Sequence, residues 1–330
     1  MRDFSLYPYN VFLDRMLTLV NFQVARQLYA GPMMNRRFVT VDVFTDRAFG
    51  GNPLAVVLDA EGLSDDAMQA VAREFNLSET TFVLPPADPA NTARVRIFTP
   101  GRELPFAGHP NVGTAFVLAR EGSLFGKPIR SILRFEEAAG LVLVDIRTGP
   151  DGPAGARLTT PQGFSRTDEF SPADFAACVN LGPADIDTSA HPPLLGSAGM
   201  TFPIARLSGV DALGRARSNA DAMARHPAMG GHIFVYVPDP DVPGTFRARM
   251  FAPGLGIAED PATGGAAAAL TGLLGTLAAG DGSYDYRIIQ GVEMGRPSLI
   301  ETAADVAGGT VTAIRVGGAC AAVMRGEIEI

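Results

Sequence analysis

Cysteine is scarce in this sequence of 330 residues, which contains only Cys178 and Cys320. The two thiols form no CxxC pair and no cluster with metal-ligand spacing, so the sequence predicts neither a disulfide scaffold nor a metal site. A chain of this size without a disulfide framework is typical of a reducing compartment. We therefore expect a cytoplasmic protein that holds no metal.

Basic residues are too few and too dispersed for a nucleic-acid surface. The chain has 27 Lys and Arg against 35 Asp and Glu, which gives a net charge of −8. Phosphate recognition needs clustered cations, so we expect no nucleic-acid partner. A small anionic substrate stays compatible with this charge, because a single helix N-terminus can bind an anion locally.

The sequence also lacks a convincing membrane segment. The apolar stretch Gly264–Gly280 is slightly short for a span, is rich in glycine, and has no aromatic or basic anchors. The run Met16–Val20 is shorter still, and no cleavage site follows it. We expect no membrane partner. Residues 1–34 are predicted to be an extension outside the fold, with Met34 a better beginning than Met1.

Several common catalytic motifs are missing. The sequence contains no GxxxxGK[ST], GxSxG or HExxH, and no GxGxxG after a strand. Nucleotide, serine-hydrolase, zinc-protease and dinucleotide chemistry therefore have no support.

Apolar patterning predicts two similar halves. Val112–Leu118 and Gly264–Gly280 are apolar nearly all round, which indicates two buried helices. A helix buried on every face needs sheet around it, and strand patterns flank both. In one of them, Val39, Val41 and Val43 alternate with polar residues as in a half-buried strand. The class predicted is α+β, with two modules and a cleft between them.

The division between the modules is predicted in the turn-rich segment Thr148–Gly155. This gives a first domain of residues 35–152 and a second of residues 153–320.

Three polar clusters interrupt apolar surroundings. The first, Asn76–Phe82, contains Glu79 at a junction between a helix and a strand. Partial burial would raise the pKa of this carboxyl group and suit it to proton transfer near neutral pH. From spacing alone, a solvated loop glutamate is the more ordinary interpretation.

The second and third clusters precede the two buried helices. Glu103–Asn111 brings His109 to the start of the first helix, and Glu259–Gly265 brings Asp260 to the start of the second. The plain alternative is ordinary capping by His109, Asp260 or Thr263. The recurrence favours a shared role, in which two helix N-termini point into one cleft and bind a carboxylate. A fourth segment, Gln290–Ser298, is either a surface turn or a support for this site.

With these residues assembled, the chain resembles the PhzF-like family of phenazine-biosynthesis proteins. The resemblance rests on five motifs in the family's order: FVTVDVFTDRAFGGNPLAVVL (Phe38–Leu58), NLSETTFVL (Asn76–Leu84), PFAGHPNVGTAF (Pro105–Phe116), EDPATGGAAAAL (Glu259–Leu270) and QGVEMGRPS (Gln290–Ser298). It implies the fold of diaminopimelate epimerase, with two related domains, each a curled and mostly antiparallel sheet or barrel around a central helix. It also implies a homodimer, and a last strand, Ala321–Ile330, that returns to the first domain.

The resemblance further implies a cofactor-independent isomerase that moves a proton on a small carboxylate-bearing substrate, either amino-acid-like or dihydroaromatic. Glu79 is then the acid/base, with His109 and Asp260 as its catalytic partners. The expected substrate-binding residues surround the two helix starts: Gly108, Asn111, Thr263, Gly264 and Gly265. Gly265 departs from the family, which often has Ser there, so the substrate is expected to differ.

Other functions stay open on the same scaffold. An epimerase or a lyase would use the same carboxylate, and a non-catalytic protein would keep only the binding cleft. A racemase with two thiols is disfavoured, because Cys178 and Cys320 lie outside the helix-start motifs.

Overall fold

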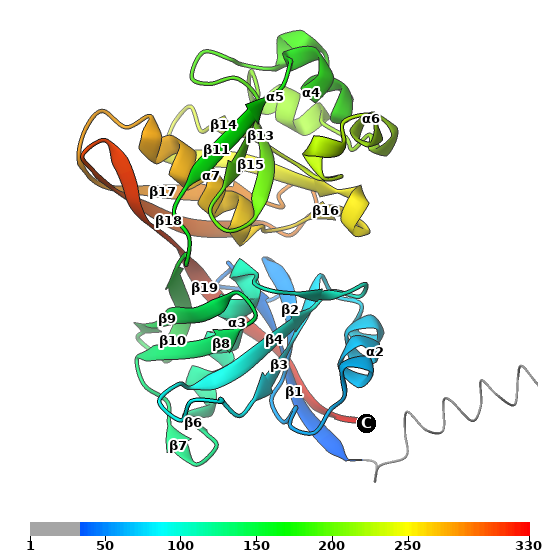
Figure 1. Ribbon diagram of the computed structural model, residues 1–330, viewed down its shortest axis with the longest axis vertical. Helices are drawn as coiled ribbons and strands as arrows, with labels where there is room; N and C mark the ends of the chain where they lie inside the picture. Colours follow the sequence, from blue (N-terminus) through cyan, green and yellow to red (C-terminus); the bar gives the residue numbers. More distant parts are fainter. Residues whose placement is uncertain (1–33) are drawn as a thin grey trace, which may run out of the picture.

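The computed structural model describes residues 34–330, which form two lobes linked by a short connecting segment and by one long strand (Figure 1). The N-terminal extension predicted from the sequence lies outside these residues, apart from Met34. Met34 exchanges two backbone hydrogen bonds with Ile330, of 2.9 and 3.2 Å, so this residue belongs to the fold. No helix within the described residues is long and apolar enough to cross a membrane.

The N-terminal lobe is a closed barrel around one helix. Its strands pair in a ring, in this order: β1 (Asn35–Val43), β2 (Asn52–Val57), β3 (Glu79–Leu84), β4 (Ala93–Phe98), β8 (Ile132–Glu137), β9 (Gly140–Gly149), β10 (Gly152–Thr159) and β19 (Thr310–Glu329), which returns to β1. The ring encloses α3 (Gly108–Glu121), which is buried from Gly108 to Leu118. The predicted buried helix is confirmed. It begins earlier than its apolar run because the GHP turn is already helical.

The C-terminal lobe is a curled sheet around a second helix. Its strands pair in this order: β11 (Ser165–Glu169), β12 (Leu194–Ser197), β13 (Thr201–Arg206), β14 (Ile233–Pro238), β15 (Thr245–Ala252), β17 (Gly282–Gln290), β18 (Ser298–Ala307) and the first part of β19. The helix α7 (Gly264–Thr276) packs against β12, β13, β18 and β19. It is the second buried helix predicted from the sequence.

The smaller elements lie on the outside or at the lobe junction. Around the N-terminal lobe they are α2 (Asp65–Phe75), β5 (Glu103–Leu104), β6 (Ser123–Leu124) and β7 (Lys127–Pro128). Around the C-terminal lobe they are α4 (Pro172–Cys178), α5 (Val210–Arg215), α6 (Ala220–Ala224), β16 (Ile257–Asp260) and the 3₁₀ turns Pro183–Asp185, Pro227–Met229 and Pro253–Leu255.

The two lobes repeat one topology. Most of the strand pairs are antiparallel, but β2–β3 and β4–β8 are parallel in the first lobe, as are β13–β14 and β15–β17 in the second. A short strand precedes each central helix, β5 before α3 and β16 before α7. The α+β class with two related modules is therefore confirmed, and the repeat places the two helix starts at equivalent positions.

Two local predictions need correction. The segment Thr148–Gly155 is not a linker but the hairpin turn between β9 and β10, with Gly149 paired to Gly152. The turn residues that suggested a linker serve here to reverse the chain, and β10 still pairs within the first barrel. Strand pairing therefore places the crossing to the second lobe after Thr159.

The strand β1 is also not half-buried throughout. Thr40 and Asp42, on the face expected to be polar and exposed, are each only 3% exposed. Asp42 accepts hydrogen bonds from Phe49 N and Arg296, and the Thr40 hydroxyl accepts one from Met324 N. Neighbouring segments thus cover the outer face of β1.

The strand β19 crosses from the second lobe into the first and closes the barrel (Figure 1). Near the crossing its backbone lies very close to β10. A methyl group on Gly317 would lie 2.5 Å from the backbone oxygen of Ala156, and one on Gly155 would lie 2.1 Å from the oxygen of Gly318. Only glycine allows this approach.

We therefore expect Gly317→Ala to lower the free energy of unfolding by about 2 kcal/mol, because backbone has to shift to admit the methyl group. Urea denaturation measures the change. Gly163→Ala is the matched control, since a methyl group there meets no atom within 4 Å. Equal midpoints for the two variants would contradict the close-approach argument.

Candidate active site

The N-termini of the two central helices meet at the junction of the lobes. A methyl group on Gly108 would lie 3.2 Å from the Cα of Gly264, so the two helix starts are in contact. The residues that precede them, Ala107 and Thr263, make no side-chain capping bond to the helix. Capping by these residues is therefore excluded, and the two positive dipole ends point together into one region.

A cavity of about 340 Å³ opens at this junction. Its walls include the predicted residues Glu79, His109, Asp260, Gly108, Thr263, Gly264 and Gly265. The structure thus brings together three clusters that lie far apart in the sequence. Of the predicted site residues, only Asn111 does not line this cavity.

Glu79 begins β3 and extends into the cavity, with 13% of its side-chain surface exposed. Its Oε2 is buried and makes no hydrogen bond to any described residue. Burial raises the pKa of this carboxyl group well above its ordinary value, and the negative charge of Asp260 raises it further. A carboxyl group with a raised pKa takes up and releases its proton at a higher pH than a solvated glutamate does.

Asp260 is held by a network of side chains at the end of β16. Its Oδ1 accepts a hydrogen bond of 2.9 Å from the Asn52 amide, and its Oδ2 accepts one of 2.6 Å from the Thr263 hydroxyl. Gln290 donates to the backbone oxygen of Asp260 at 2.7 Å. Burial raises the pKa of Asp260, while its hydrogen bonds act in the opposite direction. The network fixes the Asp260 carboxyl group, whereas Glu79 is not fixed in this way.

His109 is the second residue of α3 and is only 4% exposed. Its Nδ1 lies 3.4 Å from the amide nitrogen of Asn52, which cannot accept a hydrogen bond, so we place the ring proton on Nε2. Nε2 lies 3.2 Å from Oε2 of Glu79, but neither atom makes a well-aligned hydrogen bond. Burial lowers the pKa of His109 to about 3, so at neutral pH this residue is an uncharged hydrogen-bond donor.

Two supporting residues were not singled out from the sequence. Asn52 is the first residue of β2, and besides Asp260 it donates to the backbone oxygen of Ala262 at 2.9 Å. Gln290 accepts from the backbone N–H of Thr263 at 3.1 Å. Both lie within motifs that carry the family resemblance, which was the available signal. The segment Gln290–Ser298 is therefore a turn whose ends support the site.

Asn111 lies behind the site instead of in it. Its amide donates to the backbone oxygen of Ala107 at 2.9 Å and so holds the start of α3. Glu137 lies near Asn111, and both of its carboxyl oxygens are buried without a well-aligned hydrogen bond within the described residues. Burial raises the pKa of Glu137 to about 8, and the nearby Asn111 amide offsets only part of this rise.

This shift makes Glu137 a source of pH-dependent stability. The folded pKa of about 8 exceeds the ordinary 4.5, so the folded state holds an extra proton between these values. Stability associated with the neutral carboxyl is therefore complete below pH 4.5 and decreases as the pH rises through 8. Glu137→Gln stays neutral at every pH. We therefore expect its free energy of unfolding, relative to that of the wild type, to be roughly 3 kcal/mol larger at pH 8.5 than at pH 5.5.

Urea unfolding at the two pH values measures this difference. Glu61→Gln, on an exposed glutamate, is the control and is expected to show no such pH dependence. If the difference in free energy of unfolding between Glu137→Gln and the wild type is the same at both pH values, the buried carboxyl does not have the raised pKa stated above.

Comparison with known proteins agrees with this geometry. Residues 41–326 match the sequence model of the family described as phenazine biosynthesis-like protein. An uncharacterized isomerase of Mesorhizobium japonicum is 39% identical and aligns over 90% of this chain and 100% of its own length. The trans-2,3-dihydro-3-hydroxyanthranilate isomerase of Pseudomonas aeruginosa is 36% identical, over 88% of this chain and 98% of its own.

Solved structures show the same fold. A PhzF-family phenazine biosynthesis protein of Bacillus anthracis superposes with a TM-score of 0.81 at 25% identity, over 90% of this chain and 100% of its own. A hydroxyproline epimerase of Agrobacterium vitis, at 15% identity, shares the fold with a TM-score of 0.58, over 90% of this chain and 93% of its own.

The fold and the junction site together define a two-lobed protein with the epimerase-like fold, in which the ionisable groups Glu79, His109 and Asp260 line a cavity at two paired helix starts. Within this class, the chain belongs to the phenazine biosynthesis-like family. Its curated relatives at 36 and 39% identity are named isomerases.

Proposed function

We propose that this isomerase moves a proton between two carbon atoms of a small carboxylate, with Glu79 as the acid/base. One observation carries the proposal: the Glu79 carboxyl is buried, has an oxygen without a hydrogen-bond partner, and lines the cavity at which two uncapped helix starts meet. Such a group has no evident structural role and combines a raised pKa with access to a bound molecule.

The substrate carboxylate binds at the helix starts, where backbone N–H groups and the dipoles favour negative charge. Glu79 in its ionised form removes a proton from a C–H next to an unsaturated bond. The electron pair delocalises toward the carboxylate, and the helix starts stabilise the charge that develops there. Protonated Glu79 then returns the proton to another carbon, so the substrate is isomerised without net gain or loss of electrons.

The other groups orient the reactants. His109 donates from Nε2 into the cavity as a neutral imidazole, and Asp260 positions the start of α7 through Thr263. The negative charge of Asp260 raises the pKa of Glu79, which helps to keep the protonated form of Glu79 available for returning the proton. No step requires a redox group or a second base.

The name of the Pseudomonas aeruginosa relative supports a dihydroaromatic acid as the type of substrate. Incubation with cyclic unsaturated carboxylates in D₂O tests the proposal by NMR. We expect the wild type to incorporate deuterium at an allylic carbon and to shift the double bond. Binding of these acids without any exchange would support the non-catalytic alternative, and inversion at a stereocentre without a double-bond shift would support an epimerase.

We also infer that the enzyme acts in a reducing cytoplasm as a homodimer. Both cysteines are buried and unpaired, which suits a compartment without disulfide formation. Light scattering in solution tests the dimer, and a monomeric mass would contradict it.

A further inference from the structure

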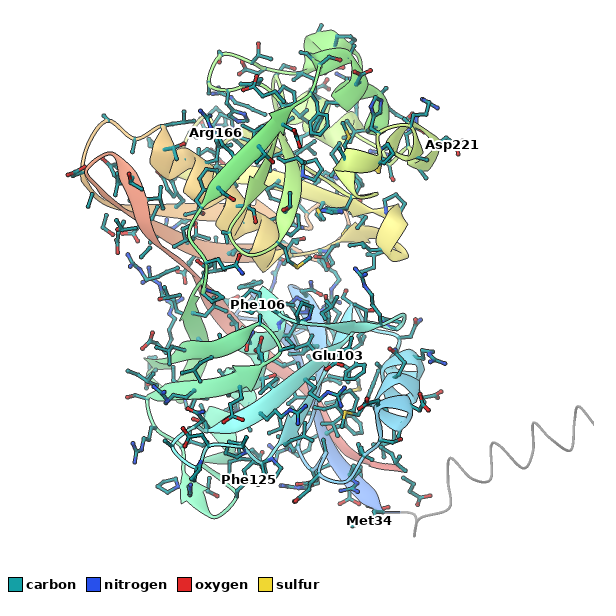
Figure 2. All side chains as sticks on the ribbon, in the orientation of Figure 1. Met34, Glu103, Phe106, Phe125, Arg166 and Asp221 are labelled. Carbon is teal, nitrogen blue, oxygen red and sulfur yellow. The ribbon has the colours of Figure 1, made fainter. Side chains whose placement is uncertain are left out.

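Most of the cavity wall is apolar, and this has a consequence for the substrate. The ionisable side chains that line the cavity are Glu79, Arg102, His109 and Asp260, of which Arg102 is exposed. The remaining wall is dominated by apolar side chains from both lobes: Leu104, Phe106, Leu158, Met200, Phe202, Met250, Leu255, Ile257 and Val316. Figure 2 shows Phe106 at the level where the two lobes meet.

The wall beside the start of α7 is aromatic because Gly265 has no side chain. A methyl group at this position would lie 3.1 and 3.2 Å from two ring carbons of Phe202. Phe202 thus packs directly beside Gly265, so a side chain there would require the ring to shift. Its ring is held in place by His232, edge to face at 5.4 Å. The start of α7 therefore offers its backbone, with an apolar ring immediately beside it.

These walls discriminate between kinds of substrate. A hydroxyl or amino group placed against Met200, Phe202 or Met250 would lose its water and find no hydrogen-bond partner there. An apolar group in the same position would be favoured by the area it removes from water. Polar side chains line the cavity at Thr99, Arg102 and Thr160 as well as at the helix starts. At the helix starts, the fully buried Nε2 of His109 lacks a hydrogen-bond partner within the described residues.

We propose that the substrate is a monocarboxylate with an apolar body larger than one six-membered ring, which the cavity of about 340 Å³ can hold and which packs against Met200, Phe202 and Met250. This rests on the proposed function only for the position of the carboxylate at the helix starts. Gly265 and Phe202 together determine the specificity. Because Gly265 has no side chain, the Phe202 ring can pack beside it and form the cavity wall.

Calorimetry on the wild type tests this directly with two acids that share one unsaturated carboxylate. They are cyclohex-1-ene-1-carboxylate and the bicyclic 3,4,4a,5,6,7,8,8a-octahydro-2-naphthoate, each of which has an exchangeable C–H at the carbon next to the double bond. We expect the bicyclic acid to bind roughly tenfold more tightly or better, because its additional ring is buried against apolar wall. Equal affinities, or tighter binding of the single ring, would overturn the proposal.

A variant locates the preference. Met200→Gln keeps the side-chain length but puts an amide on the apolar wall, so we expect the preference for the bicyclic acid to fall several-fold while binding of the single ring changes little. Met324→Gln is the matched control, because Met324 lies on β19 and is 59% exposed. A preference that survives Met200→Gln unchanged would place the ring elsewhere and contradict the proposed wall.

Deuterium incorporation by the same two acids separates this proposal from the proposed function. A bicyclic preference in binding without exchange of either acid would sustain the apolar-body proposal and contradict the isomerase. Exchange of both acids without a binding preference would support the isomerase and contradict the apolar-body proposal.

Discussion

Replacing Glu79 with glutamine is expected to abolish isomerisation, with a loss of at least about a thousandfold in kcat. The amide has nearly the same shape as the carboxyl but cannot accept a proton from carbon. Because the pKa of Glu79 is raised by burial, the carboxyl is costly to ionise in the folded state. A neutral amide avoids this cost, so the variant is expected to be at least as stable as the wild type at pH 8.

This combination distinguishes a catalytic role from a structural one. Rates of deuterium incorporation and urea midpoints are measured on the same preparations, together with binding of an unsaturated acid. Glu74→Gln is the control, since Glu74 is an exposed glutamate of the nearby helix α2. Glu79→Gln with wild-type exchange would remove Glu79 as the base, and loss of both exchange and stability would indicate a structural role instead.

The pH dependence of the wild-type rate follows from the same group. The ionised form of Glu79 removes the proton, so the rate is expected to fall as the pH drops through the raised pKa of Glu79. His109 is neutral down to about pH 3 and contributes no step near pH 6.5.

Replacing Arg296 with methionine is expected to destabilise the protein by about 3 kcal/mol. Arg296, in the turn between β17 and β18, donates to Asp42 at 2.6 Å and to the backbone oxygens of Gly50 and Gly51 at 2.7 and 2.9 Å. Only 4% of the Asp42 side chain is exposed. The variant therefore leaves a buried carboxylate without its cationic partner.

Substrate binding is expected to weaken as well, because the Gly50–Gly51 turn leads directly into Asn52, which donates a hydrogen bond to Asp260. We expect the KM for the carboxylate to rise more than kcat falls, since Arg296 positions the site without touching the reacting atoms.

A double-mutant cycle checks the origin of the effect. Asp42→Asn removes the charge that Arg296 neutralises, so the double variant is expected to recover part of the lost stability. Arg147→Met is the comparison, because its partner Glu301 and Arg147 itself are both well exposed, and such pairs contribute within about 1 kcal/mol. If Arg296→Met and Arg147→Met unfold at equal urea concentrations, the ion pair of Arg296 with Asp42 contributes no more to the free energy of unfolding than an exposed ion pair does.

Asn111 was predicted from its motif to bind substrate, but it does not line the cavity. Asn111 follows His109 closely in the sequence, but the turn from Gly108 is already helical, and its side chain reaches back to Ala107. Proximity along a helix does not decide which face reaches a cavity. The linker prediction at Thr148–Gly155 failed similarly, because a hairpin and a linker use the same turn residues.

The sequence alone determined the local features that depend on neighbouring residues. Apolar runs without charge specified two buried helices, glycine and proline specified their entry turns, and motif order indicated the family. These follow from periodicity and backbone preference, which act over a few residues.

Only the tertiary structure decided how these parts combine into a site. Contact between the starts of α3 and α7, the orphaned oxygen of Glu79 and the ring of Phe202 over Gly265 all join segments that are distant along the chain. Burial, and with it the raised pKa of Glu79, is a property of that assembly. No single segment encodes it, because desolvation comes from the surfaces that other segments bring.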